Sequence, residues 1–492
     1  MTLDRREFIG VSAGAVIAPL VFGLPAARAR GDGAGAAAAR KATNLVFMVA
    51  DGMSFGTLIL GDLLRQLRDN RRSAWIDLIG TAGVTRSLVQ TRSADGFVTD
   101  SSAASTAWGI GELVDNGRVG MTPDGRFPTP ILVHAAQAGK ATGLVTTTRV
   151  THATPAGFCC NIPTNRDDEK RIARQMLERR VPLLFGGGRK FFPESTLALR
   201  AADLQVTASR AEFDAFAPGE QGAGPMLSLF ADSHMSFEID RVTDKLAEPS
   251  LAEMSAAALR RLDRAGGGNG FVVQIEGGRV DHGGHYNDAA GLLYDMLAFD
   301  DAVAAVRSWA ATRDDTLVIV TADHATANPG LTEYGARGVR NFLKALEFKH
   351  SFEWMERRLA PHFSLANPEP PEFGDGEAAQ VTGASIDAEL LRSTVLEATG
   401  IALGKGEMDL LVRWKRGEMT DGFAMASSRF GPLAAVLANH HSIAFLSPNH
   451  TADPVELTAW GPGSAGIPAS MVINEVHAHL VRALDLPPAK PV

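Results

Sequence analysis

Short apolar runs alternate with amphipathic stretches along most of the chain. Asn44–Ala50, Thr142–Thr147, Phe271–Ile275 and Thr316–Thr321 combine apolar and β-branched residues, which is typical of buried strands. The long stretch from Asp288 to Thr312 has helical periodicity and lies between two of these runs. Strands that alternate with helices predict an α/β three-layer sandwich, in which helices flank a large, mainly parallel central sheet.

The same pattern predicts further helices from position 52 to about Asp69, over Ile131–Ala138 and over Asp167–Arg180, and a strand over Val181–Phe185. The segment 330–440 departs from this rhythm, since it has charged helical patterns and a proline-rich stretch at 368–371 but no comparable strand run. We interpret 330–440 as a cap or crown insertion within one catalytic domain that spans 30–492.

The N-terminus has the pattern of an export signal. Arg5-Arg6 precede an apolar stretch from Val11 to Leu24, and Ala27-Arg28-Ala29 is a small-x-small cleavage pattern. We interpret 1–29 as a twin-arginine signal peptide, which predicts a periplasmic or secreted protein with no stable membrane span after cleavage. A buried or membrane-anchoring helix is the alternative.

Composition narrows the function classes. The 492 residues are 45% hydrophobic, enough for a packed core, and 56 acidic against 48 basic residues give a net charge of −8. An acidic balance argues against binding to duplex nucleic acid. The two cysteines, Cys159 and Cys160, are adjacent and cannot form a disulfide scaffold. A large globular protein that is an enzyme or a binding protein remains.

Chemically active side chains follow three of the predicted strands. Asp51, Glu276 and the pair Asp323-His324 stand where open α/β sheets place their sites. Asp323 and His324 would diverge if the strand continued, so both reach one site only if the strand ends in a bend.

Asp281 and His285 are four residues apart, so one turn of helix or a tight glycine loop aims both at one ion. Mixed histidine and aspartate clusters suit zinc, although each pair alone favours an ordinary surface pair, and only the recurrence of such pairs at predicted strand ends favours a metal.

The candidate nucleophile lies in the segment Asp100–Gly109, in which small residues allow a helix to begin with exposed N–H groups. Such a helix start favours phosphate. Ser101 would be the first helical residue or the cap, with an ordinary serine cap as the alternative interpretation. Ser102 is the nearest rival as nucleophile.

Taken together, these motifs resemble the alkaline phosphatase family of two-zinc phosphomonoesterases. The resemblance covers nearly the whole mature chain in family order, from Asp51 to His450. The segments that carry it are Val49–Met53, Asp100–Trp108, Thr151–Ala156 with Asn165-Arg166, Glu276–His285, Val320–His324 and Asn449–Ala452.

The resemblance implies two zinc ions and a third metal, usually Mg²⁺. The implied ligands are Asp281, His285 and His450 for one zinc; Asp51, Asp323, His324 and the Ser101 alkoxide for the other; and Asp51, Thr154 and Glu276 for the third metal. His152 and His282 would lie beside the third site, either shifting its preference towards zinc or cobalt or acting without touching the metal.

The implied activity is hydrolysis of phosphate monoesters at alkaline pH through a phosphoserine at Ser101, with Arg166 holding two phosphate oxygens. Family members are commonly dimers, so a homodimer is implied as well. The alternatives are a phosphodiesterase or phosphonate hydrolase on the same scaffold, or an exported metal- or phosphate-binding protein without turnover. A sulfatase is disfavoured because the sequence has no Cys-x-Pro-x-Arg segment.

Overall fold

The computed structural model describes residues 41–216, 224–364, 387–416, 418 and 430–492. The predicted signal peptide and the proline-rich stretch at 368–371 lie outside these residues. Within them, no helix combines the length and the apolar character needed to cross a membrane.

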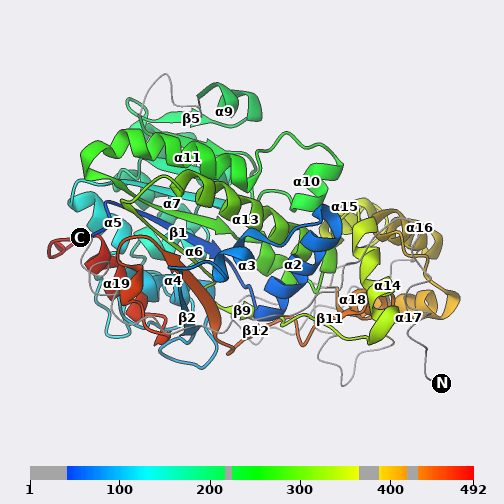
Figure 1. Ribbon diagram of the computed structural model, residues 1–492. Helices are drawn as coiled ribbons and strands as arrows, with labels where there is room; N and C mark the ends of the chain where they lie inside the picture. The colour runs from blue at the N-terminus through cyan, green and yellow to red at the C-terminus, as the bar shows by residue number, and fades with distance from the viewer. Residues whose placement is uncertain (1–40, 217–223, 365–386, 417, 419–429) are drawn as a thin grey trace.

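A ten-stranded sheet forms the centre of the protein, with strand order β14-β2-β13-β8-β1-β7-β3-β4-β6-β5 (Figure 1). Neighbouring strands are parallel except where β13 pairs antiparallel with β2 and with β8. The strand bounds, in sheet order, are Ser470–Val472, Thr85–Gln90, Val455–Trp460, Thr316–Thr321, Asn44–Ala50, Phe271–Gly277, Ala141–Arg149, Leu183–Gly187, Met226–Leu229 and Gln205–Thr207.

Helices cover both faces of this sheet, so the expected three-layer α/β fold is confirmed. In Figure 1, α11 and α13 lie above the sheet, whereas α4, α6 and α19 lie below it. The helices in this part of the chain are α2 (Phe55–Asp69), α3 (Ala74–Ile79), α4 (Ser101–Ile110), α5 (Ile131–Gln137), α6 (Ala153–Cys159), α7 (Glu169–Glu178), α8 (Glu194–Leu197), α9 (Arg210–Phe216), α10 (Glu238–Thr243), α11 (Leu251–Gly266), α12 (Arg279–His285), α13 (Ala289–Ala310) and α19 (Glu475–Ala483).

The strands predicted from apolar runs are present at nearly the predicted positions. β1 and β8 have the predicted bounds, β3 and β7 are slightly longer than the predicted runs, and β4 begins and ends slightly later than predicted. Every residue of β1, β7 and β8 is buried. Strands buried on both faces lose the alternation of polar and apolar residues, which explains why continuous apolar runs identified them.

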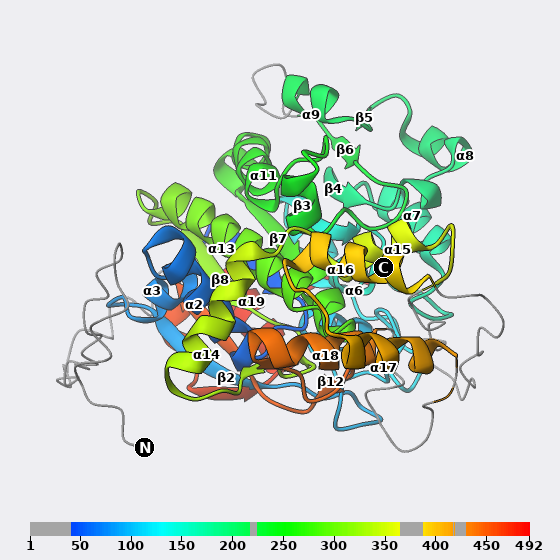
Figure 2. The same ribbon diagram turned by 90° about the vertical axis from the view of Figure 1, so that its right-hand side faces the viewer.

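The described residues of the segment 330–440 form mainly helices at one end of the sheet (Figures 1 and 2). These helices have a hydrophobic cluster of their own, which also includes Leu60 and Leu64 of α2 and Leu293 of α13. The bounds are α14 (Gly335–Phe342), α15 (Phe352–Leu359), α16 (Ala388–Thr399), α17 (Lys405–Lys415) and α18 (Gly431–His441, which ends one residue beyond the segment).

Buried carboxylates attach α15 to the rest of the molecule. The backbone N–H of Ser351 donates to Asp240 Oδ1 at 2.9 Å, and that of Phe352 donates to Asp288 Oδ2 at 2.7 Å. Burial raises the pKa of Asp288 to about 7. Helix α15 therefore starts on acceptors from outside its own segment, which fixes its position relative to the sheet.

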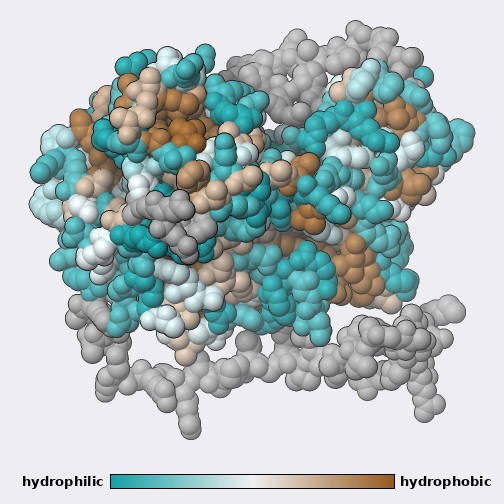
Figure 3. Space-filling view, turned by 90° about the horizontal axis from the view of Figure 1, so that it is seen from above, coloured by the Kyte–Doolittle hydropathy of each residue, from teal (hydrophilic) through white to brown (hydrophobic). Residues whose placement is uncertain are grey.

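The surface seen from above is mostly hydrophilic, and its hydrophobic residues gather in separate patches (Figure 3).

The two cysteines, Cys159 and Cys160, are buried and free, with 3.4 Å between their sulfur atoms. Buried free cysteines of this kind pack as small hydrophobic residues.

The core beneath the sheet is organised around Phe47, a fully buried residue of β1. Its ring centroid lies 5.0 Å from that of Trp108 in α4 and 5.4 Å from that of Phe158 in α6. The two helices also touch directly, because a Cβ on Gly157 would lie only 2.6 Å from the backbone nitrogen of Thr106. One strand residue therefore sets the depth of both helices against the sheet.

We expect Phe47→Ala to lower the free energy of unfolding by about 3–5 kcal/mol, because it leaves a cavity under α4 and α6. Tyr334→Ala, at a residue that is 91% exposed, should change stability by less than about 0.5 kcal/mol. Urea unfolding followed by circular dichroism measures both values. Equal effects of the two substitutions would contradict this account of the core.

Candidate active site

Carboxylates meet where the central strands end. β8, β1 and β7 are adjacent and parallel, so their carboxyl ends share one edge of the sheet. Asp51 follows β1, Glu276 lies at the end of β7, and Asp323 follows β8. Asp281 joins them from α12, the helix directly after β7. All four side chains are buried.

A bend after β8 turns Asp323 and His324 to the same place. The strand ends at Thr321, and both residues stand in the bend that follows. His324 Nε2 lies 3.2 Å from Asp323 Oδ2 and 3.7 Å from Asp51 Oδ1. The condition for both side chains to reach one site, a strand that finishes in a bend, is therefore met.

Asp281 and His285 stand one turn apart on α12, with 3.1 Å between Asp281 Oδ2 and His285 Nε2. His450 reaches the same point from a distant part of the chain. It lies in β12 (His450–Thr451), which pairs antiparallel with β9 (Ala325–Thr326), directly after the bend at His324. His450 Nε2 lies 3.6 Å from Asp281 Oδ1.

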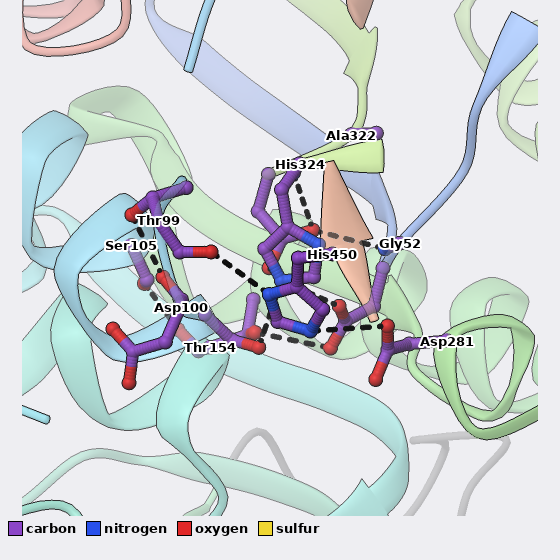
Figure 4. A network of polar contacts seen from close by, with 12 residues as sticks. Gly52, Thr99, Asp100, Ser105, Thr154, Asp281, Ala322, His324 and His450 are labelled. Carbon is purple, nitrogen blue, oxygen red and sulfur yellow. Dashed lines mark hydrogen bonds and ion pairs between the residues drawn. The ribbon is translucent and has the colours of Figure 1, made fainter. Parts of the chain in front are cut away.

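Backbone carbonyls fix the orientation of these two rings. His285 Nδ1 donates to Pro448 O at 2.6 Å. His450 Nδ1 donates to Thr99 O at 2.8 Å, as Figure 4 shows. A carbonyl only accepts, so the neutral rings carry their hydrogen on Nδ1 and a lone pair on Nε2. The two Nε2 atoms lie 2.9 Å apart beside the Asp281 carboxylate. A cation between them removes the repulsion of the facing lone pairs.

His324 is oriented in the same way by Thr326. The Thr326 hydroxyl donates to Asp281 Oδ1 at 2.6 Å, so it accepts from His324 Nδ1, which lies 3.2 Å away. The lone pair of His324 is then on Nε2, which faces Ser101 Oγ at 3.1 Å. All three predicted histidine ligands thus present the same nitrogen to the site.

Asp100 caps α4 and leaves Ser101 as its first helical residue. Asp100 Oδ1 accepts from the backbone N–H of Ala103 at 2.8 Å. Its Oδ2 accepts from Ser102 Oγ at 2.6 Å and from Arg166 Nη1 at 3.1 Å. Ser102 is therefore engaged with the cap, whereas Ser101 faces His324. The helix contributes its positive N-terminal end at this point.

A third group of oxygen atoms surrounds Asp51. Thr154 Oγ1 donates to Asp51 Oδ2 at 3.3 Å, and Glu276 Oε2 accepts from the hydroxyls of Thr146 and Thr148. Asp51 Oδ1, Glu276 Oε1 and Asp323 Oδ2 are buried without a hydrogen-bond partner among the described residues. Unpaired buried carboxylate oxygens of this kind suit bound cations.

Burial opposes ionisation of Asp51, Glu276 and Asp323 when no cation is present, whereas Asp281 behaves in the opposite way. Burial raises the pKa of Asp51 well above its usual range, and Asp323, Asp281 and Glu276 raise it further. Burial raises the pKa of Asp323 to about 7. Burial also acts to raise the pKa of Asp281, but His285 and His450 outweigh it and hold that pKa well below its usual range.

Nitrogen and oxygen ligands at the first two groups fit zinc, and the oxygen ligands of the third fit magnesium. Three groups at this centre have ligand atoms close enough together to hold one ion each: Asp281 with His285 and His450, Asp51 with Asp323 and His324, and Asp51 with His152 and Glu276. The first two groups consist of histidines and carboxylates predicted as zinc ligands. The third has His152 beside Asp51 and Glu276, and the predicted Thr154 contacts Asp51 through its hydroxyl. The role of all these residues as ligands stays a prediction.

Arg166 and the two remaining predicted histidines lie beside this centre. Arg166 Nη2 is 3.3 Å from His152 Nε2, and the ring centroids of His152 and His282 are 5.7 Å apart. His234 was not predicted, although its ring centroid lies 4.4 Å from that of His282. No pattern around His234 signals a role, since it stands in a loop after β6. The threonines at 146 and 148 did have a signal, because they lie at the end of a predicted strand.

The fold and the site place the protein among α/β proteins that gather chemically active side chains at the carboxyl edge of a mainly parallel sheet. A family model described as "Alkaline phosphatase" matches residues 42–211 and 201–486. The chain belongs to the alkaline phosphatase family, which confirms the expected family and, with it, the expected class of enzyme.

Individual relatives agree with this assignment. The chain is 32% identical to the alkaline phosphatase of Thermus thermophilus, whose crystal structure matches with a TM-score of 0.79 over 92% of this chain and 94% of that one. It is 25% identical to alkaline phosphatase 3 of Bacillus subtilis over 90% of this chain and 89% of the relative. It is 35% identical to the repressible alkaline phosphatase of Saccharomyces cerevisiae over 59% of this chain, and spans 56% of that protein's length.

We expect zinc binding to the metal-free protein to release protons near pH 6. Burial gives Asp323 a pKa of about 7, and that of Asp51 is also raised, so these carboxyls hold protons that a cation must displace. Above about pH 8 the Asp323 carboxyl is already ionised, so fewer protons should be released and the affinity should be higher. Calorimetry in buffers of different ionisation enthalpy measures the release. Equal release at pH 6 and pH 8 would contradict the raised pKa values.

Proposed function

We propose that the protein hydrolyses phosphate monoesters through a phosphoserine formed on Ser101. The observation that carries this proposal is the position of Ser101 Oγ. It lies at the N-terminus of α4, 3.1 Å from His324 Nε2, and its neighbour Asp100 holds Arg166. The Ser101 hydroxyl, the Arg166 guanidinium and the positive N-terminal end of α4 thus lie close together, as phosphoryl transfer requires.

The reaction takes place in two displacements. Ser101 Oγ bonds to phosphorus as the ester P–O bond breaks, and the serine proton ends on the departing alcohol. Water then bonds to phosphorus, the Oγ–P bond breaks, and Ser101 regains a proton as inorganic phosphate leaves. When bound, two zinc ions supply positive charge next to the attacking and departing oxygens. The protein holds Ser101 and the phosphate in line.

For the third site we propose magnesium. Asp51, Thr154 and Glu276 offer oxygen atoms there. His152 lies close, but its Nε2 accepts from Arg166, so the neutral ring carries its hydrogen on Nδ1. With one nitrogen engaged and the other protonated, His152 is a poor ligand, which argues against zinc or cobalt in the third site.

We also propose that residues 1–29 direct export by the twin-arginine route, to the periplasm or to the extracellular space, and that the protein forms a homodimer. A further proposal is that the segment 330–440 caps the active site. The cap interpretation is supported by a contact between the two parts, since Arg279 of the site helix α12 donates to Glu353 of α15.

We expect Ser101→Ala to reduce hydrolysis of p-nitrophenyl phosphate by about 10³-fold or more, because the nucleophile is lost. Ser102→Ala is the matched control. It removes only a hydrogen bond to the Asp100 cap, so activity should stay within about tenfold. Steady-state assays from about pH 7 to 10 with zinc and magnesium measure both variants and the expected alkaline optimum.

Acid quenching of the wild-type enzyme with labelled substrate should trap phosphoserine. Full activity of Ser101→Ala would contradict the proposed nucleophile. A protein that binds zinc and phosphate but gives neither turnover nor phosphoserine is instead a binding protein.

We expect Arg166→Lys to lower kcat/KM for monoesters by about 10–100-fold, because lysine cannot hold two phosphate oxygens with one planar fork. The loss should be smaller for a diester such as bis-p-nitrophenyl phosphate, which has one non-bridging oxygen fewer. The mono- to diesterase ratio of kcat/KM measures this. A ratio below one in the wild-type enzyme would favour a phosphodiesterase or phosphonate hydrolase.

A further inference from the structure

Three histidines from separate elements form a cluster beside the third metal group. His152 caps the N-terminus of α6, His234 lies in the loop after β6, and His282 belongs to α12. Their ring centroids are 4.4, 5.3 and 5.7 Å apart, and one nitrogen of each lies within 4.8 Å of the others. The spacing alone would suit a metal ion held by three imidazoles.

Arginine contacts argue against a metal here. His152 Nε2 lies 3.3 Å from Arg166 Nη2, and His282 Nδ1 lies 2.7 Å from Arg279 Nη1. The third ring has the same kind of contact, between His234 Nε2 and Nη1 of Arg149. A guanidinium has only donors, so each of these ring nitrogens accepts. In the neutral rings the opposite nitrogen then carries the hydrogen and has no lone pair for a metal.

Carboxylates hold all three arginines in these positions. Arg149 pairs with Glu169 at 2.8 Å and Arg166 pairs with Asp100 at 3.1 Å. Arg279, which is buried, pairs with Glu353, and its guanidinium lies 3.8 Å from the centroid of the Phe237 ring. The tautomers of the three histidines are therefore set by a rigid frame of ion pairs.

The donors that result lack acceptors. His152 Nδ1 and His234 Nδ1 are buried and have no hydrogen-bond partner in the part of the chain that the structure describes. His152 is only 6% exposed, whereas His234 and His282 are partly exposed, so the cluster extends from the interior to the surface. A buried donor without an acceptor is unfavourable, and a ligand with several acceptor oxygens can supply the missing hydrogen bonds.

We propose that His152, His234 and His282 form a second oxyanion subsite, which binds a phosphoryl group through imidazole N–H donors next to the reaction centre. Arg166 links the two sites, since it contacts both Asp100 and His152. The ligand is either free inorganic phosphate or the second phosphoryl group of a substrate that has two. Phosphate binding requires no turnover, so the subsite can be tested independently of hydrolysis at Ser101.

Phosphate binding to the zinc- and magnesium-loaded Ser101→Ala protein tests the subsite. Equilibrium dialysis with labelled inorganic phosphate should find two phosphates per chain. His234→Leu in the same background removes one donor and should leave one phosphate. The matched control, His234→Asn, keeps an N–H near the Nδ1 position and should retain two. Thermal melts establish that the variants fold, and a phosphate-soaked crystal of the Ser101→Ala protein should show the second ion within hydrogen-bond distance of the three rings.

One phosphate per chain in the Ser101→Ala protein, or an unchanged count in His234→Leu, would overturn the subsite. So would loss of a bound metal equivalent in His234→Leu, because that result assigns the cluster to a metal.

Comparing substrates that have one and two phosphoryl groups distinguishes free phosphate from a second group of the substrate as the ligand. If the second group belongs to the substrate, His234→Leu should lower kcat/KM for pyrophosphate by about tenfold, equivalent to one lost hydrogen bond, and leave p-nitrophenyl phosphate within about twofold. If the ligand is free phosphate, only inhibition by added phosphate should change. Either result supports the subsite, whereas equal losses for both substrates would place His234 in the reaction centre and overturn it.

Discussion

Four carboxylates buried at one edge of the sheet repel one another unless cations lie between them. Asp51, Glu276, Asp281 and Asp323 are almost completely removed from solvent, and the pKa values of Asp51 and Asp323 are raised, first by burial. The parallel strands force this proximity, because their carboxyl ends share an edge. The rest of the centre is consistent with a place for cations, since backbone and threonine oxygens orient three histidines so that each presents Nε2 to the carboxylates.

The helix that bears Ser101 is tied to the same centre by its cap. Asp100 accepts hydrogen bonds from Ala103, Ser102 and Arg166. This single carboxylate therefore caps the helix, engages the hydroxyl of Ser102 and fixes the guanidinium of Arg166. Phe47 then sets the depth of that helix against the sheet. The position of Ser101 and the stability of the core therefore depend on contacts of the same helix, α4. A helix packed against the sheet holds the nucleophile more firmly than a loop would.

Much of this arrangement could be predicted from the chain. Strands buried on both faces appear as apolar runs, so β1 and β8 were located without error, and the residues after them were identified as candidate ligands. The spacing of Asp281 and His285 allowed a helical turn or a glycine loop, and the two residues lie on a helix, α12. His234 could not be predicted, because it reaches the cluster through a loop whose path depends on strand order. Thr326, which orients His324, was missed because its contacts with His324 and Asp281 depend on the bend after β8 and on the approach of α12.

The sequence alone therefore determined the α/β class, the helix and strand pattern and the residue types available for metal and phosphate chemistry. Local periodicity and side-chain chemistry are properties of short segments, and short segments are read directly from the chain. Only the tertiary structure decided which nitrogen of each histidine faces the site, which serine of the pair faces His324, and that three histidines meet three arginines. These outcomes depend on hydrogen bonds between residues that are far apart in the sequence, such as His450 and Thr99, and no local pattern contains them.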